Sequence, residues 1–170
     1  MRAFYNCKSL KQITLPPKIT EWYEESFAYS GLESVCFEEG LEIIGGLAFA
    51  HTNIKSIVLP TSIKMIGDGA FGDNPELESV SLNNGLITIG NSAFGGQTKL
   101  TEIVIPHTVK NITEFAFNGA HQLQKVMFEG DAPATYLVEG TEKANYIIYF
   151  HKGAEGFTSP EWYGYPTEIW

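Results

Sequence analysis

The chain has 170 residues, of which 44% are apolar, so it is long enough and apolar enough for one domain with a buried core. This composition excludes a disordered chain. The longest apolar run, residues 146–150, is far shorter than the ~20 residues of a membrane-spanning helix, so no membrane insertion is expected. The formal net charge of −9 argues against nucleic acids and anionic membranes as partners, because like charges repel.

Phenylalanine recurs along the chain with gaps of 22 or 23 residues. The positions are Phe4, Phe27, Phe49, Phe71, Phe94 and Phe117. A second ladder of aliphatic residues keeps step with the first, at Leu10, Leu32, Ile54, Leu77, Leu100 and Leu123. Two ladders with one period predict a solenoid, in which each repeat buries its apolar face against its neighbours.

Each repeat opens with an apolar strand of the pattern L-x-x-V-x-F. We expect these strands to be successive rungs of one parallel sheet, ~4.8 Å apart. They cover residues 10–15, 32–37, 54–59, 77–82, 100–105 and 123–128. A turn rich in Pro, Gly and Asn follows, then a second apolar pair such as Leu41 and Ile44. The unit closes on Ala-Phe, as in Ala48-Phe49, and the phenylalanines at 49, 71, 94 and 117 are expected to stack as one buried column.

The period fails from Glu129 onward, where aromatic residues become frequent. We expect Tyr146–Phe150 to be a last strand and the remainder to cover the apolar end of the solenoid. The predicted organisation is a repeat array over residues 1–130, with a partial first repeat, and an aromatic-rich capping segment over 131–170. Exposed aromatic side chains would also suit stacking on a carbohydrate, and that alternative stays open.

The consensus L-x-x-(V/I)-x-(F/L)-P-x-x-(V/I)-x-x-I-G-x-x-A-F resembles the BspA-like class of leucine-rich repeat proteins over residues 3–130. The segment from Ala3 to Leu10 matches the A-F-x-x-C-x-x-L junction of that class, while Trp22 and Ser26 depart from the usual Ile and Ala. The resemblance implies an α/β or mainly β solenoid: a right-handed superhelix with a parallel sheet and about five repeats of 22–23 residues. It also implies a secreted or cell-surface bacterial protein used in adhesion or host-protein binding.

No motif for catalysis, a cofactor or a metal ion is present. The four histidines fall in different repeats or in the C-terminal segment, at His51, His107, His121 and His151. Asp68 and Asp73 have the composition of a calcium loop but not its spacing. Two cysteines, Cys7 and Cys36, cannot form a framework of disulfides. We therefore predict a protein that is not an enzyme and holds neither cofactor nor metal.

The candidate partner-binding face consists of the outward residues of the first strands. One column is Gln12, Ser34, Ser56, Ser79, Glu102 and Lys125, and the other is Thr14, Cys36, Val58, Ser81, Val104 and Met127. Their small, partly apolar side chains mark a contact site or only reflect the preference of strands for β-branched residues. Residues 21–42 carry seven glutamates and no lysine or arginine, which indicates a solvated face or a site for a basic partner or cation.

The leading interpretation is a non-catalytic protein-binding or adhesion module, whose ligand is a protein such as a host or extracellular-matrix protein. The alternatives are an accessory repeat domain of a larger exported enzyme, a carbohydrate-binding module acting through the aromatic C-terminal segment, and a structural spacer. An extracellular or cell-surface location rests on the resemblance, because Met1–Leu10 contains no signal peptide. We hypothesise a trimmed piece of a longer exported protein, which self-associates through the strand edge around Lys11–Leu15.

Overall fold

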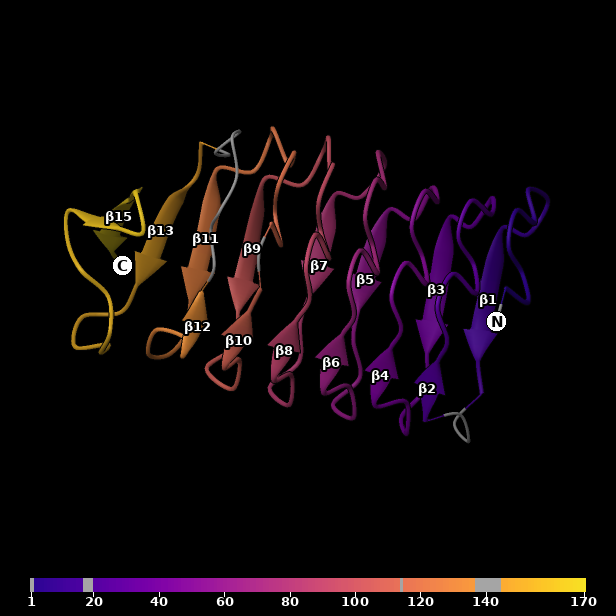
Figure 1. The fold of residues 1–170 in the computed structure, drawn as a ribbon, viewed down its shortest axis with the longest axis horizontal. Helices are drawn as coiled ribbons and strands as arrows, with labels where there is room; N and C mark the ends of the chain where they lie inside the picture. Colours follow the sequence, from indigo (N-terminus) through magenta and orange to yellow (C-terminus); the bar gives the residue numbers. More distant parts are fainter. Residues whose placement is uncertain (1, 17–19, 114, 137–144) are drawn as a thin grey trace.

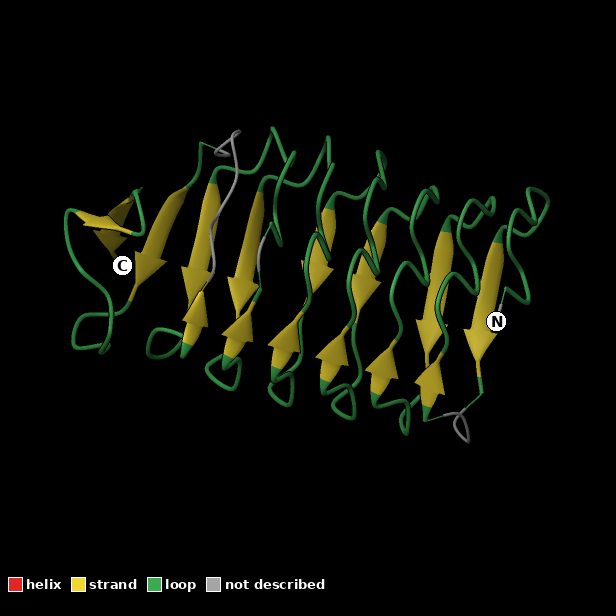
Figure 2. Cartoon of the chain, in the orientation of Figure 1, coloured by secondary structure: helices red, strands yellow, loops and turns green. Residues whose placement is uncertain are grey.

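The computed structural model describes residues 2–16, 20–113, 115–136 and 145–170. Fifteen strands and no helix occur in these residues, which makes the fold mainly β. The chain winds in successive turns, and each turn adds one strand to each of two walls (Figures 1 and 2). The predicted parallel-sheet solenoid is confirmed, with about six turns at a spacing of 22 or 23 residues.

The first wall is built by the strands predicted from the aliphatic ladder. They are β1 (Gln12–Leu15), β3 (Ser34–Phe37), β5 (Ser56–Val58), β7 (Ser79–Ser81), β9 (Glu102–Ile105) and β11 (Lys125–Phe128). They follow one another in the predicted order, but their hydrogen-bonded ladder is interrupted between β3 and β5 and between β7 and β9. The strands remain neighbours across both interruptions, and just before β5 the N–H of Asn53 donates to the carbonyl of Leu32 at 2.8 Å. The expectation of one unbroken sheet was therefore wrong for the hydrogen bonds and right for the order of the rungs.

The second wall is one continuous six-stranded parallel sheet made of two-residue strands. Its strands are β2 (Glu21–Trp22), β4 (Ile43–Ile44), β6 (Met65–Ile66), β8 (Thr88–Ile89), β10 (Asn111–Ile112) and β12 (Thr135–Tyr136). From β4 to β12 the second residue of each strand is buried in the core and the first faces outward, as the pleat requires. The apolar pairs of the sequence thus become the inner surface of a second sheet.

A column of phenylalanine rings fills the space between the walls. Phe71 stacks on Phe49 at 5.5 Å and on Phe94 at 5.6 Å between ring centroids, with the planes within 10° of parallel. The column continues through Phe117, as predicted, and extends in the other direction to Phe27 and the half-buried Phe4. One ring per turn therefore packs face to face along the described array.

Two left-handed residues flank the column phenylalanine, and they produce the two corners that bring the chain around it. Two residues before it φ is positive at Glu25, Leu47, Gly69, Ser92 and Phe115, and two residues after it φ is positive at Asn6, Tyr29, His51, Asp73, Gly96 and Gly119. A side chain in this conformation costs roughly 1–2 kcal/mol. Bonds between neighbouring turns offset that cost: the N–H of Leu47 donates to Asp68 O at 2.8 Å and that of His51 to Gly72 O at 2.9 Å.

The first wall continues beyond residue 130. Strand β13 (Ile147–Phe150) pairs in parallel with β11, and β15 (Tyr165–Ile169) pairs in parallel with β13. The short β14 (Glu161–Trp162) is antiparallel to β15. The strand expected at 146–150 is therefore confirmed, but it is followed by a further rung that the sequence did not predict.

Aromatic side chains of the C-terminal segment pack against one another at this end of the core. Tyr146 stacks on Tyr165 at 4.3 Å, and the hydroxyls of Tyr136 and Tyr146 share a hydrogen bond of 2.8 Å. Burial is the main cause that raises the pKa of both Tyr136 and Tyr146 far above 10.0, the usual value. Trp162 is also buried. These rings have no free faces with which to stack on a sugar.

Candidate interaction surface

The outward face of the first wall brings together all twelve residues predicted for partner binding. Ten of them are exposed, while Val104 and Met127 are half-buried. Parallel pairing places residues of the same column side by side, as in Gln12 beside Ser34. The two predicted columns therefore exist as neighbouring rows on one face of the solenoid.

The middle of this face, over β3, β5 and β7, carries only small and uncharged outward side chains. They are Ser34, Cys36, Ser56, Val58, Ser79 and Ser81. Val58 is the most prominent, with 68% of its surface exposed. Because short side chains lose little conformational entropy on contact, this strip offers a flat surface that a partner can approach closely.

The C-terminal end of the face is different, because long side chains take over. Lys125 and Glu102 lie side by side with 4.0 Å between Nζ and Oε2. Pairing of β13 with β11 adds Ile147 and Tyr149 to the two columns. Burial and the neighbouring Glu168 raise the pKa of Tyr149 above its usual value.

Sequence reasoning missed Ile147 and Tyr149 as members of this face. The segment 146–150 is apolar throughout, so it shows no alternation between inward and outward residues. The spacing from Lys125 and Met127 was the usable signal, since Ile147 and Tyr149 each follow their neighbour by 22 residues.

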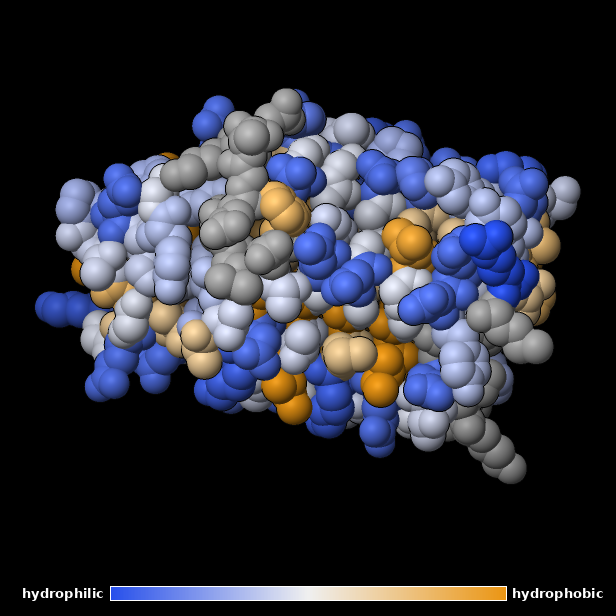
Figure 3. Space-filling view, viewed as in Figure 1, coloured by the Kyte–Doolittle hydropathy of each residue, from blue (hydrophilic) through white to orange (hydrophobic). Residues whose placement is uncertain are grey.

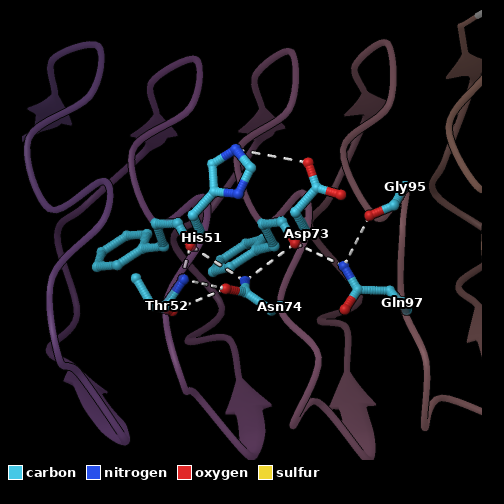
Figure 4. A network of polar contacts seen from close by, with 8 residues as sticks. His51, Thr52, Asp73, Asn74, Gly95 and Gln97 are labelled. Atoms are coloured by element: carbon cyan, nitrogen blue, oxygen red, sulfur yellow. Dashed lines mark hydrogen bonds and ion pairs between the residues drawn. The ribbon is translucent and has the colours of Figure 1, made fainter.

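One contact between titratable residues was also missed. His51 Nε2 lies 3.5 Å from Asp73 Oδ2, and the imidazole stacks on Tyr29 at 4.2 Å (Figure 4). All three residues sit two positions after a column phenylalanine, and that shared position predicts their proximity. Within the residues that the structure describes, no group of three or more His, Cys, Asp or Glu side chains is arranged to hold a metal ion.

A buried polar ladder runs beside the phenylalanine column, three residues after each ring. Asn74 donates to the carbonyls of Phe49 and Phe71, each at 3.0 Å, and Gln97 donates to Phe71 O at 2.6 Å (Figure 4). Asn74, Gln97 and Thr52 are almost completely buried. This ladder joins neighbouring turns and is closed to solvent, so it stabilises the fold and is not a binding site.

Comparison with known families identifies the repeats. Six copies of the BspA type leucine rich repeat region match residues 1–78 and 65–135. The chain belongs to the BspA-type leucine-rich repeat family. The repeat unit of this BspA-type protein is therefore the junction-to-junction segment described above, with one strand on each wall. No curated protein matches the chain significantly.

Three solved structures share the fold of this BspA-type protein. The pneumococcal vaccine antigen PcpA matches 85% of this chain with a TM-score of 0.70 and 21% identity, over 46% of its own length. A leucine-rich repeat protein from Bacteroides ovatus matches 96% of this chain with a TM-score of 0.60 and 18% identity, over 52% of its length. A leucine rich cell surface protein from Faecalibacterium prausnitzii matches 69% with a TM-score of 0.53 and 21% identity, over 38% of its length.

The BspA-type chain spans about half the length of the first of these proteins, or less. At identities of 18–21% the likeness concerns the fold alone. The described residues contain no helix with the length and apolar character needed to cross a bilayer.

Proposed function

We propose that this BspA-type array is a non-catalytic protein-binding module, and that its ligand lies across the outward face of the first wall. One observation carries the proposal. The middle of that face is a flat strip of small, uncharged side chains in a chain whose net charge is −9. Repeat proteins use such extended surfaces for binding, because successive rungs add contact area without changing the fold.

The proposed place of action is the bacterial cell surface or the extracellular medium. One of the proteins with a similar fold is a cell surface protein, and another is a vaccine antigen. A module at this location meets host and extracellular-matrix proteins, so the proposed ligand class is a protein of the host matrix. The proposed role is adhesion.

Surface plasmon resonance with immobilised human fibronectin, laminin and collagen tests the proposal. We expect saturable binding to at least one of them in the micromolar range, with dissociation constants of about 1–100 µM, typical of modest interfaces without large anchor side chains. The control surface carries serum albumin. Failure to bind any matrix protein above the albumin signal would contradict the adhesion proposal.

A further inference from the structure

The second wall carries an exposed apolar strip on the opposite side of the core from the first wall. The strip consists of Ile43, Leu47, Met65 and Ile87. Ile43 is half-buried, while Met65, Ile87 and Leu47 are 37%, 44% and 45% exposed. Figure 3 shows apolar atoms gathered on this face over β4, β6 and β8. Four large aliphatic side chains on neighbouring turns indicate a contact surface.

These residues are neighbours because of the register of the second wall. Ile43 pairs directly with Met65. The N–H of Ile87 donates to the carbonyl of Lys64 at 2.9 Å, which brings Ile87 next to Met65. The strip is therefore continuous across β4, β6 and the start of β8.

An open depression of about 340 Å³ adjoins the strip, and Leu47 belongs to both. Glu24, Asp68, Asn91 and Ser92 supply its polar lining. Asp68 Oδ1 accepts a hydrogen bond of 2.8 Å from the N–H of Asn91, which fixes the carboxylate in place. The depression thus sets two acidic side chains beside an aliphatic one.

The charges around the strip and the depression are almost all negative. The segments 20–25, 42–47 and 64–69 contain Glu21, Glu24, Glu25, Glu42 and Asp68 against the single cation Lys64. A Cβ atom placed on Gly85 would lie 2.8 Å from Lys64 Nζ, so this amine is directed to the turn at Gly85, away from Asp68. A partner that covers the strip must therefore be positively charged at its rim.

We propose that this face docks a basic, amphipathic segment of a partner protein. Aliphatic side chains of the segment cover Ile43, Met65 and Ile87, while a lysine or arginine enters the depression beside Glu24 and Asp68. A nucleic acid or an anionic membrane would be repelled by the same carboxylates. This surface is separate from the face assigned to the matrix ligand and takes a partner of different chemistry.

Fluorescence anisotropy with three labelled peptides of equal length tests the proposal. The probe alternates lysine with leucine, one control alternates lysine with serine, and the other alternates glutamate with leucine. We expect the lysine–leucine peptide to bind and the lysine–serine peptide to bind about fivefold more weakly, equivalent to about 1 kcal/mol of lost apolar contact. The glutamate–leucine peptide should not bind.

Two variants with matched controls locate the binding. Asp68→Asn keeps an oxygen that can accept from Asn91 and removes one charge, and Glu129→Gln removes the same charge at an exposed turn outside the strip. Met65→Ser shortens a strip residue, and Val58→Ser shortens an exposed residue of the first wall. Asp68→Asn and Met65→Ser should each weaken binding of the lysine–leucine peptide about threefold to fivefold, or about 0.7–1 kcal/mol, while the two controls leave it unchanged.

Three outcomes would overturn the proposal. They are absence of binding, equal affinity for the lysine–leucine and lysine–serine peptides, and equal weakening by Asp68→Asn and Glu129→Gln. The last would show attraction to the net charge of the whole protein and not to this face. Because Val58 lies on the first wall, none of these outcomes bears on the matrix-binding proposal.

Discussion

Thr52 and Asn74 occupy the same position in consecutive turns, and both donors of Thr52 converge on the side-chain oxygen of Asn74. The backbone N–H of Thr52 lies 2.7 Å and its hydroxyl 2.8 Å from Asn74 Oδ1. The amide nitrogen of Asn74 binds the carbonyls of Phe49 and Phe71 in return. One buried amide therefore satisfies four polar groups of two turns that have no access to water.

Asn74→Ala should destabilise the fold by about 3 kcal/mol, because it leaves a buried N–H and two buried carbonyls without partners. The free energy of unfolding from urea titration measures this loss. Asn53→Ala is the matched control, since Asn53 is exposed, and it should change stability by less than about 0.5 kcal/mol. Equal losses for the two variants would contradict the role assigned to the ladder.

Phe71→Ala should cost about 3–5 kcal/mol, through lost transfer energy and the cavity left between Phe49 and Phe94. Phe4→Ala should cost less, because Phe4 is half-buried and stacks on Phe27 at one end of the column. Thermal or urea unfolding of the two variants gives the comparison. A loss below about 1 kcal/mol for Phe71→Ala would show that the rings do not pack as described.

The rungs of the first wall and the phenylalanine column follow from the sequence because both are set by large apolar residues at a fixed period. The second wall was not recognised as a sheet, since strands of two residues are too short to show alternation. The corners were also missed: residues such as Leu47 and His51 adopt positive φ, which sequence reasoning assigns to glycine. Hydrogen bonds between turns hold these residues there, and such bonds are not visible in a pattern.

The candidate face could be predicted in outline and not in extent. Alternation within the strands correctly placed Val58 and Ser81 outward and side by side. Ile147 and Tyr149 joined the face only when the register of β13 was known. The apolar strip around Met65 was hidden, because residues such as Leu47 and Ile87 are hydrophobic and would ordinarily be assigned to the core.

The buried tyrosine pair predicts a loss of stability at alkaline pH. The pKa values of Tyr136 and Tyr146 are raised in the folded chain above 10.0, the ordinary value expected when unfolded. Their contribution to stability is therefore fully present below pH 10 and is lost as the pH rises beyond it, because only the unfolded chain releases the protons.

Urea midpoints at increasing pH, with tyrosinate absorbance followed in parallel, test this expectation. The double variant Tyr136→Phe/Tyr146→Phe removes both hydroxyls together and should lose less stability between neutral and alkaline pH than the native chain does. An identical alkaline loss in the double variant would assign the effect to other groups.

The edge of β1 predicts self-association. Among the described strands β1 pairs only with β3, so its other side offers backbone donors and acceptors to a second copy of the chain. Lys11 gives little protection there, because its Nζ is held 2.8 Å from Glu33 Oε1. We expect the mass measured by light scattering to rise with concentration.

A charge placed on that edge should suppress the association. Thr14→Lys introduces a lysine in β1, and Ser56→Lys introduces the same charge within the wall on β5. The first variant should be monomeric and the second should associate like the native chain. A native chain that stays monomeric at high concentration would show that the edge is inert.

The central claim is that the first wall is the face that binds a matrix protein. The most direct test compares Val58→Arg on the first wall with Met65→Arg on the second, using surface plasmon resonance on the matrix protein that binds the native chain. Both substitutions place an arginine on an exposed strand residue, so their effects on stability should be equally small. We predict that Val58→Arg weakens binding at least about tenfold, or about 1.4 kcal/mol, and that Met65→Arg does not. Equal affinities for Val58→Arg and the native chain would contradict the claim.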